Sequence, residues 1–67
     1  MMDEYEYLQS SLKFLEDTHH NLTKVIESME LSDCSGCHTS AMALKYQRNR
    51  VEEEIKRLQD RLQALEQ

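Results

Sequence analysis

Two cysteines and a histidine lie together near the middle of this 67-residue chain, in the run Cys34-Ser35-Gly36-Cys37-His38. Thiolate sulfur and imidazole nitrogen are common zinc ligands, so Cys34, Cys37 and His38 are candidate ligands, with a fourth supplied by Asp33 or by a second chain. The same CxxCH spacing is the attachment pattern of c-type haem. Haem attachment requires an exported chain and a haem pocket, and the sequence indicates neither.

The two thiols have further interpretations that need no cofactor. Cys37, near the start of the helix that follows, could have a lowered pKa and act in a redox pair. The sequence shows no thioredoxin-like alternation of strands and helices around it, however. The simplest interpretation is two free thiols in a turn. We therefore expect no cofactor, and zinc at Cys34, Cys37 and His38 is the alternative.

The segment before the cysteines has the heptad pattern of an amphipathic helix. Asp3 followed by Glu6 resembles a capping box at its start. Apolar residues then recur at alternating steps of three and four, with His19 filling one position. The a and d positions are Tyr5, Leu8, Leu12, Leu15, His19, Leu22, Ile26 and Met29. This pattern predicts a helix over about residues 3–31.

The segment after the cysteines has the same kind of pattern, with Arg48 as its one polar member. Thr39 or Ser40 is expected to cap a helix over about residues 40–66. Its heptad positions are Ala41, Leu44, Arg48, Val51, Ile55, Leu58, Leu62 and Leu65. Between the helices we expect a turn over about residues 32–39, where Gly36, the only glycine, can adopt a positive φ.

The two heptad stripes fit one antiparallel hairpin. We pair residues across the hairpin so that their numbers sum to 70. Each of the eight resulting pairs then joins an a position of one helix to a d position of the other. His19 then faces Val51 as a partly buried histidine, and Arg48 is expected to reach an acid such as Glu52 or a partner. The predicted fold class is all-α, a single antiparallel two-helix hairpin spanning residues 1–67.

The first helix has a second stripe without charge, which we name the neutral face. It lies about 110° around the helix from the heptad stripe. Its members are Tyr7, Ser11, Phe14, Thr18, Asn21, Val25, Ser28 and Ser32. A two-helix hairpin buries only one stripe per helix, so we expect a partner or a second copy to cover this face and complete a three- or four-helix bundle. The candidate partner-binding residues are Tyr7, Ser11, Phe14, Thr18 and Val25. The alternative is that Tyr7 and Phe14 are scattered surface aromatics.

Charge and composition narrow the function. The net charge is −5: residues 1–33 hold eight acidic and two basic side chains, and residues 39–67 hold five acidic and six basic ones. Neither half has the basic stripe of a nucleic-acid surface. The acidic start lacks a signal-peptide pattern and no run is apolar enough to span a bilayer, so we expect a cytoplasmic protein. No nucleophile–base pair or carboxylate pair is evident, so we expect no enzyme.

Three resemblances bear on the role. The layout of about 67 residues, with Tyr46-Gln47 early in the second helix, resembles the small hairpin co-chaperones of type III secretion needle subunits. That resemblance implies a protein-interaction module whose partner is another helical chaperone. The length and topology are also similar to the plasmid copy-control RNA-binding hairpins, which form homodimeric four-helix bundles. The CxxC at a hairpin tip is similar to the zinc hook of DNA-repair ATPases, which implies a zinc site shared by two chains.

Overall fold

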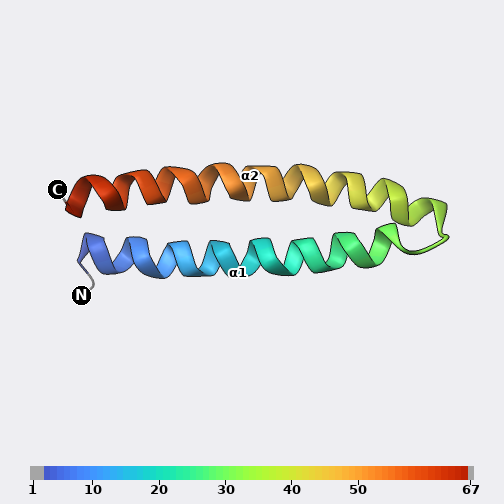
Figure 1. The fold of residues 1–67 in the computed structure, drawn as a ribbon, viewed down its shortest axis with the longest axis horizontal. Coiled ribbons are helices and arrows are strands. Elements are labelled where there is room, and N and C mark those ends of the chain that lie inside the picture. Colours follow the sequence, from blue (N-terminus) through green and yellow to red (C-terminus); the bar gives the residue numbers. More distant parts are fainter. Residues whose placement is uncertain (1–2, 67) are drawn as a thin grey trace.

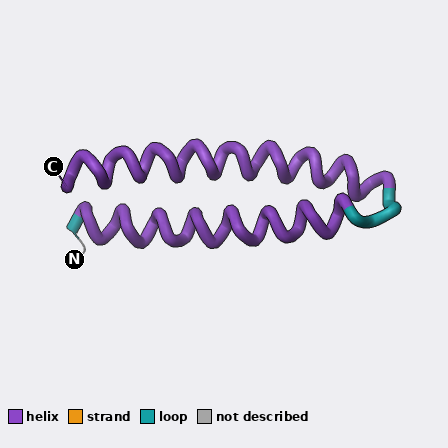
Figure 2. The backbone as a smooth tube through the Cα atoms, viewed as in Figure 1, coloured by secondary structure: helices purple, strands orange, loops and turns teal. Residues whose placement is uncertain are grey.

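The computed structural model describes residues 3–66 as two antiparallel helices. Helix α1 spans Glu4–Glu30 and helix α2 spans Ser35–Glu66. They lie side by side along a rod of 49 × 19 × 14 Å, with the start of α1 and the end of α2 at one end of the rod and the turn at the other (Figures 1 and 2). The predicted all-α hairpin is confirmed.

Helix α1 begins and ends within one residue of the predicted bounds. Asp3 is its N-cap, because an Asp3 carboxylate oxygen accepts a hydrogen bond of 2.8 Å from the backbone N–H of Glu6. At the other end, the N–H of Leu31 donates to the carbonyl of Glu27, and that of Ser32 donates to the carbonyl of Met29. The aspartate satisfies an amide that the first helical turn would otherwise leave without a partner.

The predicted start of the second helix is wrong. Helix α2 begins at Ser35, five residues before the expected position 40, so neither Thr39 nor Ser40 is its N-cap. The connection shortens to residues 31–34, and Gly36 lies in the helix without a positive φ. The reason is that Cys34 acts as the cap, since its carbonyl oxygen and its sulfur lie 3.1 Å and 3.3 Å from the backbone N of Cys37. Sulfur is a weaker acceptor than the oxygens that usually mark an N-cap, so the sequence did not indicate this role.

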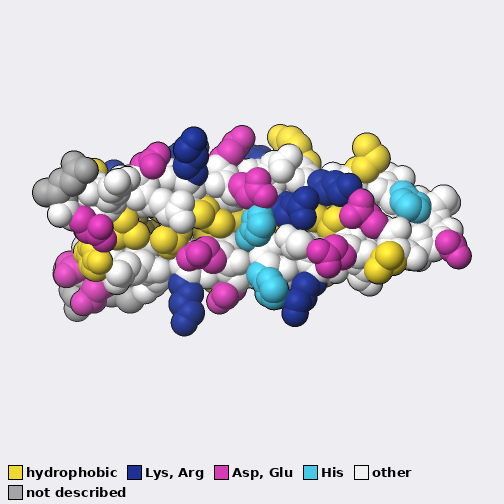
Figure 3. Space-filling model, viewed as in Figure 1, with side chains coloured by type: hydrophobic (Ala, Val, Ile, Leu, Met, Phe, Trp, Pro, Cys, Tyr) yellow, Lys and Arg dark blue, Asp and Glu magenta, His cyan; other side chains and the backbone are white. Residues whose placement is uncertain are grey.

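The predicted heptad stripes face each other, but their burial is uneven. Leu8, Ile26, Ala41 and Leu62 are buried, and the stripe residues between them are mostly half-buried. A pair of helices covers each inward side chain on one side only, which explains why so few are fully enclosed. Figure 3 shows hydrophobic side chains along the line between the helices, with charged side chains on both borders.

Two polar contacts near the middle of the pair agree with the predicted register to within one residue. His19 Nε2 lies 2.8 Å from a Glu52 carboxylate oxygen, and an Arg48 guanidinium nitrogen donates to the Thr23 hydroxyl at 3.3 Å. Arg48 therefore contacts Thr23, whereas the expected acid, Glu52, is bonded to His19. The numbers of both pairs sum to 71. At the turn, Lys45 and Glu30 form an ion pair of 2.7 Å.

Candidate functional site

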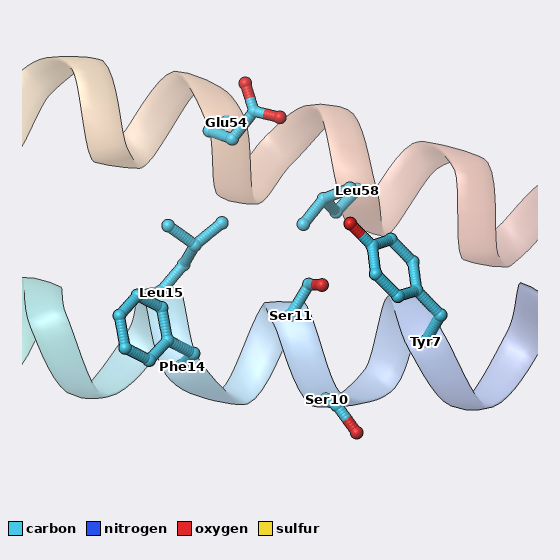
Figure 4. Close-up of a pocket in the computed structure, with 7 residues that line it drawn as sticks. All are labelled: Tyr7, Ser10, Ser11, Phe14, Leu15, Glu54 and Leu58. Atoms are coloured by element: carbon cyan, nitrogen blue, oxygen red, sulfur yellow. The ribbon is translucent and has the colours of Figure 1, made fainter. Parts of the chain in front are cut away.

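A groove lies along the part of the neutral face nearest the chain ends. Its volume is about 490 Å³, and its lining residues are Tyr7, Ser10, Ser11, Phe14, Leu15, Glu54 and Leu58. In Figure 4, Tyr7, Ser11 and Phe14 follow one another along α1, while Leu15 and Leu58 point into the space between the helices. The groove therefore has an apolar floor with two aromatic side chains beside it.

A second hollow follows on the same side of α1, nearer the turn. Its volume is about 250 Å³, and it is lined by Thr18, Asn21, Leu22, Val25 and Leu44. Together, the two hollows are lined by all five residues that the sequence analysis selected as partner-binding: Tyr7, Ser11, Phe14, Thr18 and Val25. Half-buried leucines from both helices form the floor of each hollow.

The two aromatic side chains are largely exposed to solvent. Phe14 is 70% exposed and Tyr7 is 61% exposed, and Val25 further along the face is 43% exposed. The Thr18 hydroxyl, which lies between Phe14 and Val25, already donates a hydrogen bond of 2.9 Å to the Phe14 carbonyl. The side chains that line the two hollows thus present mainly apolar surface to solvent.

The α2 border of these hollows carries arginines. Glu54 is the only charged residue lining the first hollow, and its carboxylate forms an ion pair of 3.3 Å with Arg57. Figure 4 shows this carboxylate directed away from α1. Arg50, Glu54, Arg57 and Arg61 follow one another at steps of four, three and four residues and so share one face of α2. The three arginines are exposed, so this border is basic on balance.

The other side of the hairpin has a different character. A hollow of about 360 Å³ there is lined by Glu16, His19, Glu52, Ile55, Lys56 and Gln59. Three of these six side chains are charged, and a fourth is His19, which bonds Glu52. The contrast makes the neutral face the more apolar of the two long sides of the hairpin.

The cysteines form a pair at the first turn of α2. The Cys37 thiol and backbone N–H both donate hydrogen bonds to the Cys34 sulfur, and these bonds lower the pKa of the Cys34 thiol. The same bond to Cys34 raises the pKa of the Cys37 thiol. The expectation that Cys37 has the lowered pKa is therefore wrong. The cause is the early start of α2, which places Cys34 at the N-cap, where amide hydrogens point at its sulfur.

The predicted zinc ligands are not assembled into one set. Within residues 3–66, no three histidine, cysteine, aspartate or glutamate side chains lie close enough together to hold a metal ion. Cys34 and Cys37 contact each other, but His38 does not join them. A zinc site with ligands from one chain would need at least three, so the geometry of this chain does not favour it.

Three further apolar residues toward the turn end of the hairpin are exposed, and the sequence analysis used only Tyr46 among them, in the resemblance to the hairpin co-chaperones. Leu31 is 88% exposed, Met42 is 72% exposed and Tyr46 is 65% exposed. Met42 and Tyr46 are four residues apart and so share a face of α2, and this spacing is the signal that could have identified them. They lie outside the hollows of the neutral face.

The described part of the chain contains no helix with the length and apolar character needed to cross a bilayer. Comparison with known protein families, curated proteins and solved structures finds no match to this chain.

Proposed function

We propose that this protein is a protein-interaction module that binds an amphipathic helix of a partner protein along the neutral face of α1. The observation that carries this proposal is the pair of exposed aromatics, Tyr7 and Phe14, beside an apolar groove on a stripe without charge. Aromatic side chains next to apolar hollows are typical anchors of helix-in-groove binding.

The surface area of the molecule supports the same conclusion. Its accessible surface is 5315 Å², whereas a compact monomer of 8.0 kDa exposes roughly 4450 Å². The excess is close to the roughly 800 Å² that each partner contributes to a standard protein–protein interface. One helix laid along the rod would cover an area of this order.

Charge indicates what kind of helix fits. The floor is apolar and the α2 border has Arg50, Arg57 and Arg61, so the matching helix has an apolar stripe with acidic residues on the side that faces α2. The ion pairs that Arg57 and Arg61 form with Glu54 and Glu4 are exposed. Exposed pairs contribute at most about 1 kcal/mol, so a partner's acids can replace them at little cost.

A different protein fits better than a second copy. Each chain has a net charge of −5, so a homodimer would bring two like-charged molecules together. The resemblance to the hairpin co-chaperones of type III secretion needle subunits makes another helical chaperone the first partner that we propose. A homodimeric four-helix bundle is the alternative that the experiment distinguishes.

The experiment compares two exposed aromatics, one on the neutral face and one off it. A photo-crosslinking amino acid placed at Phe14, and separately at Tyr46, is activated in living cells, and the linked chains are identified by mass spectrometry. We expect a discrete helical protein linked to position 14 and absent at position 46. Linkage to a second copy at position 14 would support the homodimer instead, and no difference between the positions would contradict the proposal.

Binding to the purified partner then tests the energetics. Phe14→Lys should weaken binding about 100-fold, because it places a charge in an apolar contact of the hot-spot kind. Tyr46→Lys is the matched control and should change affinity less than about threefold. Phe14 is exposed, so far-UV circular dichroism and thermal unfolding of Phe14→Lys should match the unsubstituted chain to within about 0.5 kcal/mol.

A further inference from the structure

Two cysteines lie together at the start of α2. Cys34 lies just before the helix, and its sulfur accepts hydrogen bonds from both the backbone N–H and the thiol of Cys37. The two cysteines are three residues apart, and both are free thiols. Residues at this spacing on a helical turn lie about 5–6 Å apart at Cβ, whereas a disulfide brings the two Cβ atoms to about 3.5–4.5 Å, so oxidation has to draw the cap and the first turn of α2 closer by roughly 1–2 Å.

The two sulfurs have unequal surroundings. Cys34 is exposed, whereas Cys37 is half-buried and its sulfur also interacts with the Ser32 side chain. Gly36 leaves one side of the Cys34 sulfur open, because a Cβ added at Gly36 would lie 3.8 Å from that sulfur. An external reagent can therefore reach Cys34 first, and Cys37 is already in place behind it.

We propose that Cys34 and Cys37 form a redox-active dithiol, which small-molecule disulfides such as oxidised glutathione convert reversibly to an intramolecular disulfide. Cys34 is the attacking residue and Cys37 is the resolving residue. The proposal goes beyond partner binding. It concerns the turn end of the hairpin, whereas the neutral-face hollows extend no further than Val25 and Leu44.

The reaction has two exchange steps. The Cys34 thiolate attacks one sulfur of oxidised glutathione, the sulfur–sulfur bond of the reagent breaks, and one glutathione leaves as a thiolate that takes a proton from water. Cys37 then loses its proton to solvent and attacks the Cys34 sulfur, which releases the second glutathione. Two electrons and two protons pass from the protein to the reagent. The pair is oxidised stoichiometrically, and an excess of free thiol reverses the reaction.

The experiment follows the reaction of the full chain with oxidised glutathione by mass spectrometry after acid quenching. The unsubstituted chain should lose two hydrogen atoms, retain no glutathione and stay free of chain-to-chain disulfides. Cys37→Ser should accumulate one glutathione on Cys34, because the resolving thiol is absent. Cys34→Ser should react at least about threefold more slowly than Cys37→Ser, because its remaining thiol is less exposed to the reagent. Serine is a good N-cap, so Cys34→Ser should retain the start of α2.

Unfolding supplies the matched control. In concentrated urea the hydrogen bonds of the cap are lost, and the two single variants should react at similar rates. Equal rates in the folded chain would overturn the proposal. So would a rate difference that persists in urea, stable glutathione adducts on both cysteines of the unsubstituted chain, or chain-to-chain disulfides as the main product.

Discussion

Gly36 occupies the second position of α2 in a conformation that any L-amino acid can adopt. Glycine in a helix is less favourable than alanine by up to about 1 kcal/mol, because the unfolded chain loses more backbone freedom on folding. The only atom that a Cβ at Gly36 would approach is the Cys34 sulfur, at an ordinary contact distance of 3.8 Å. Neither the backbone nor the available space therefore requires glycine at this position.

Gly36→Ala should raise the free energy of unfolding by about 0.4–1 kcal/mol. Urea unfolding of the reduced protein, followed by circular dichroism at 222 nm, measures the change. A turn with Gly36 at positive φ, as the sequence predicted, would give the opposite sign, because alanine is strained there. A loss of stability would therefore contradict the helical start at Ser35.

At the scale of the elements, the contact between α1 and α2 is interrupted by polar side chains near its middle. His19 and Glu52 bond each other, and Arg48 bonds Thr23. The Arg48 Nε atom is buried without a hydrogen-bond partner. A buried polar atom without a partner costs roughly 1–3 kcal/mol, so this layer holds the helices less firmly than an apolar layer of the same size would.

Arg48→Met should therefore stabilise the hairpin by about 1–2 kcal/mol, since methionine has a similar length and no polar group to bury. Thr23 retains its hydrogen bond to the His19 carbonyl, so the substitution leaves that hydroxyl satisfied. Thermal unfolding measures the effect. Arg50→Met, at an exposed position two residues along, is the control and should change stability by less than about 0.5 kcal/mol. Destabilisation by Arg48→Met would show that the arginine contributes net stability through Thr23 and the nearby Glu30.

At the scale of the whole molecule, the hairpin is long and has a thin core. Its radius of gyration is 15.3 Å, whereas a compact domain of this length has one of roughly 11 Å. Among the described residues four side chains are buried: Leu8 and Leu62 lie far from the turn, and Ile26 and Ala41 lie near it. With so little buried, each contributes a large share of the total stability.

Leu62→Ala should destabilise the protein by about 2–5 kcal/mol, because it removes buried methyl groups and leaves a cavity between the helices. Small single cores rarely supply more than about 3–5 kcal/mol, so this variant should be largely unfolded at 25 °C. Circular dichroism at 222 nm reports the loss of helix from both arms together. Leu65→Ala, three residues further and 45% exposed, is the control and should cost less than about 1.5 kcal/mol. Equal effects of the two substitutions would contradict the thin-core description.

The amino-acid sequence predicts the helical hairpin, a register that the central polar contacts match to within one residue, and the neutral face of α1. The reason is that all three follow from heptad spacing, which repeats over many residues and so averages out local exceptions such as His19 and Arg48. The five candidate partner-binding residues are adjacent to the hollows because helical spacing alone places them on one side of α1.

The turn, the hollows and the partners of the polar side chains become visible only in the folded chain. The start of α2 depends on hydrogen bonds from the Cys37 N–H to the carbonyl oxygen and the sulfur of Cys34, whereas local residue preferences favoured Thr39 or Ser40 as the cap. Arg48 bonds Thr23 and His19 bonds Glu52, and both hydrogen bonds depend on where side chains of the two helices lie relative to one another. Residue spacing along one helix does not encode such contacts, because they form only when the two helices pack at a particular distance and rotation.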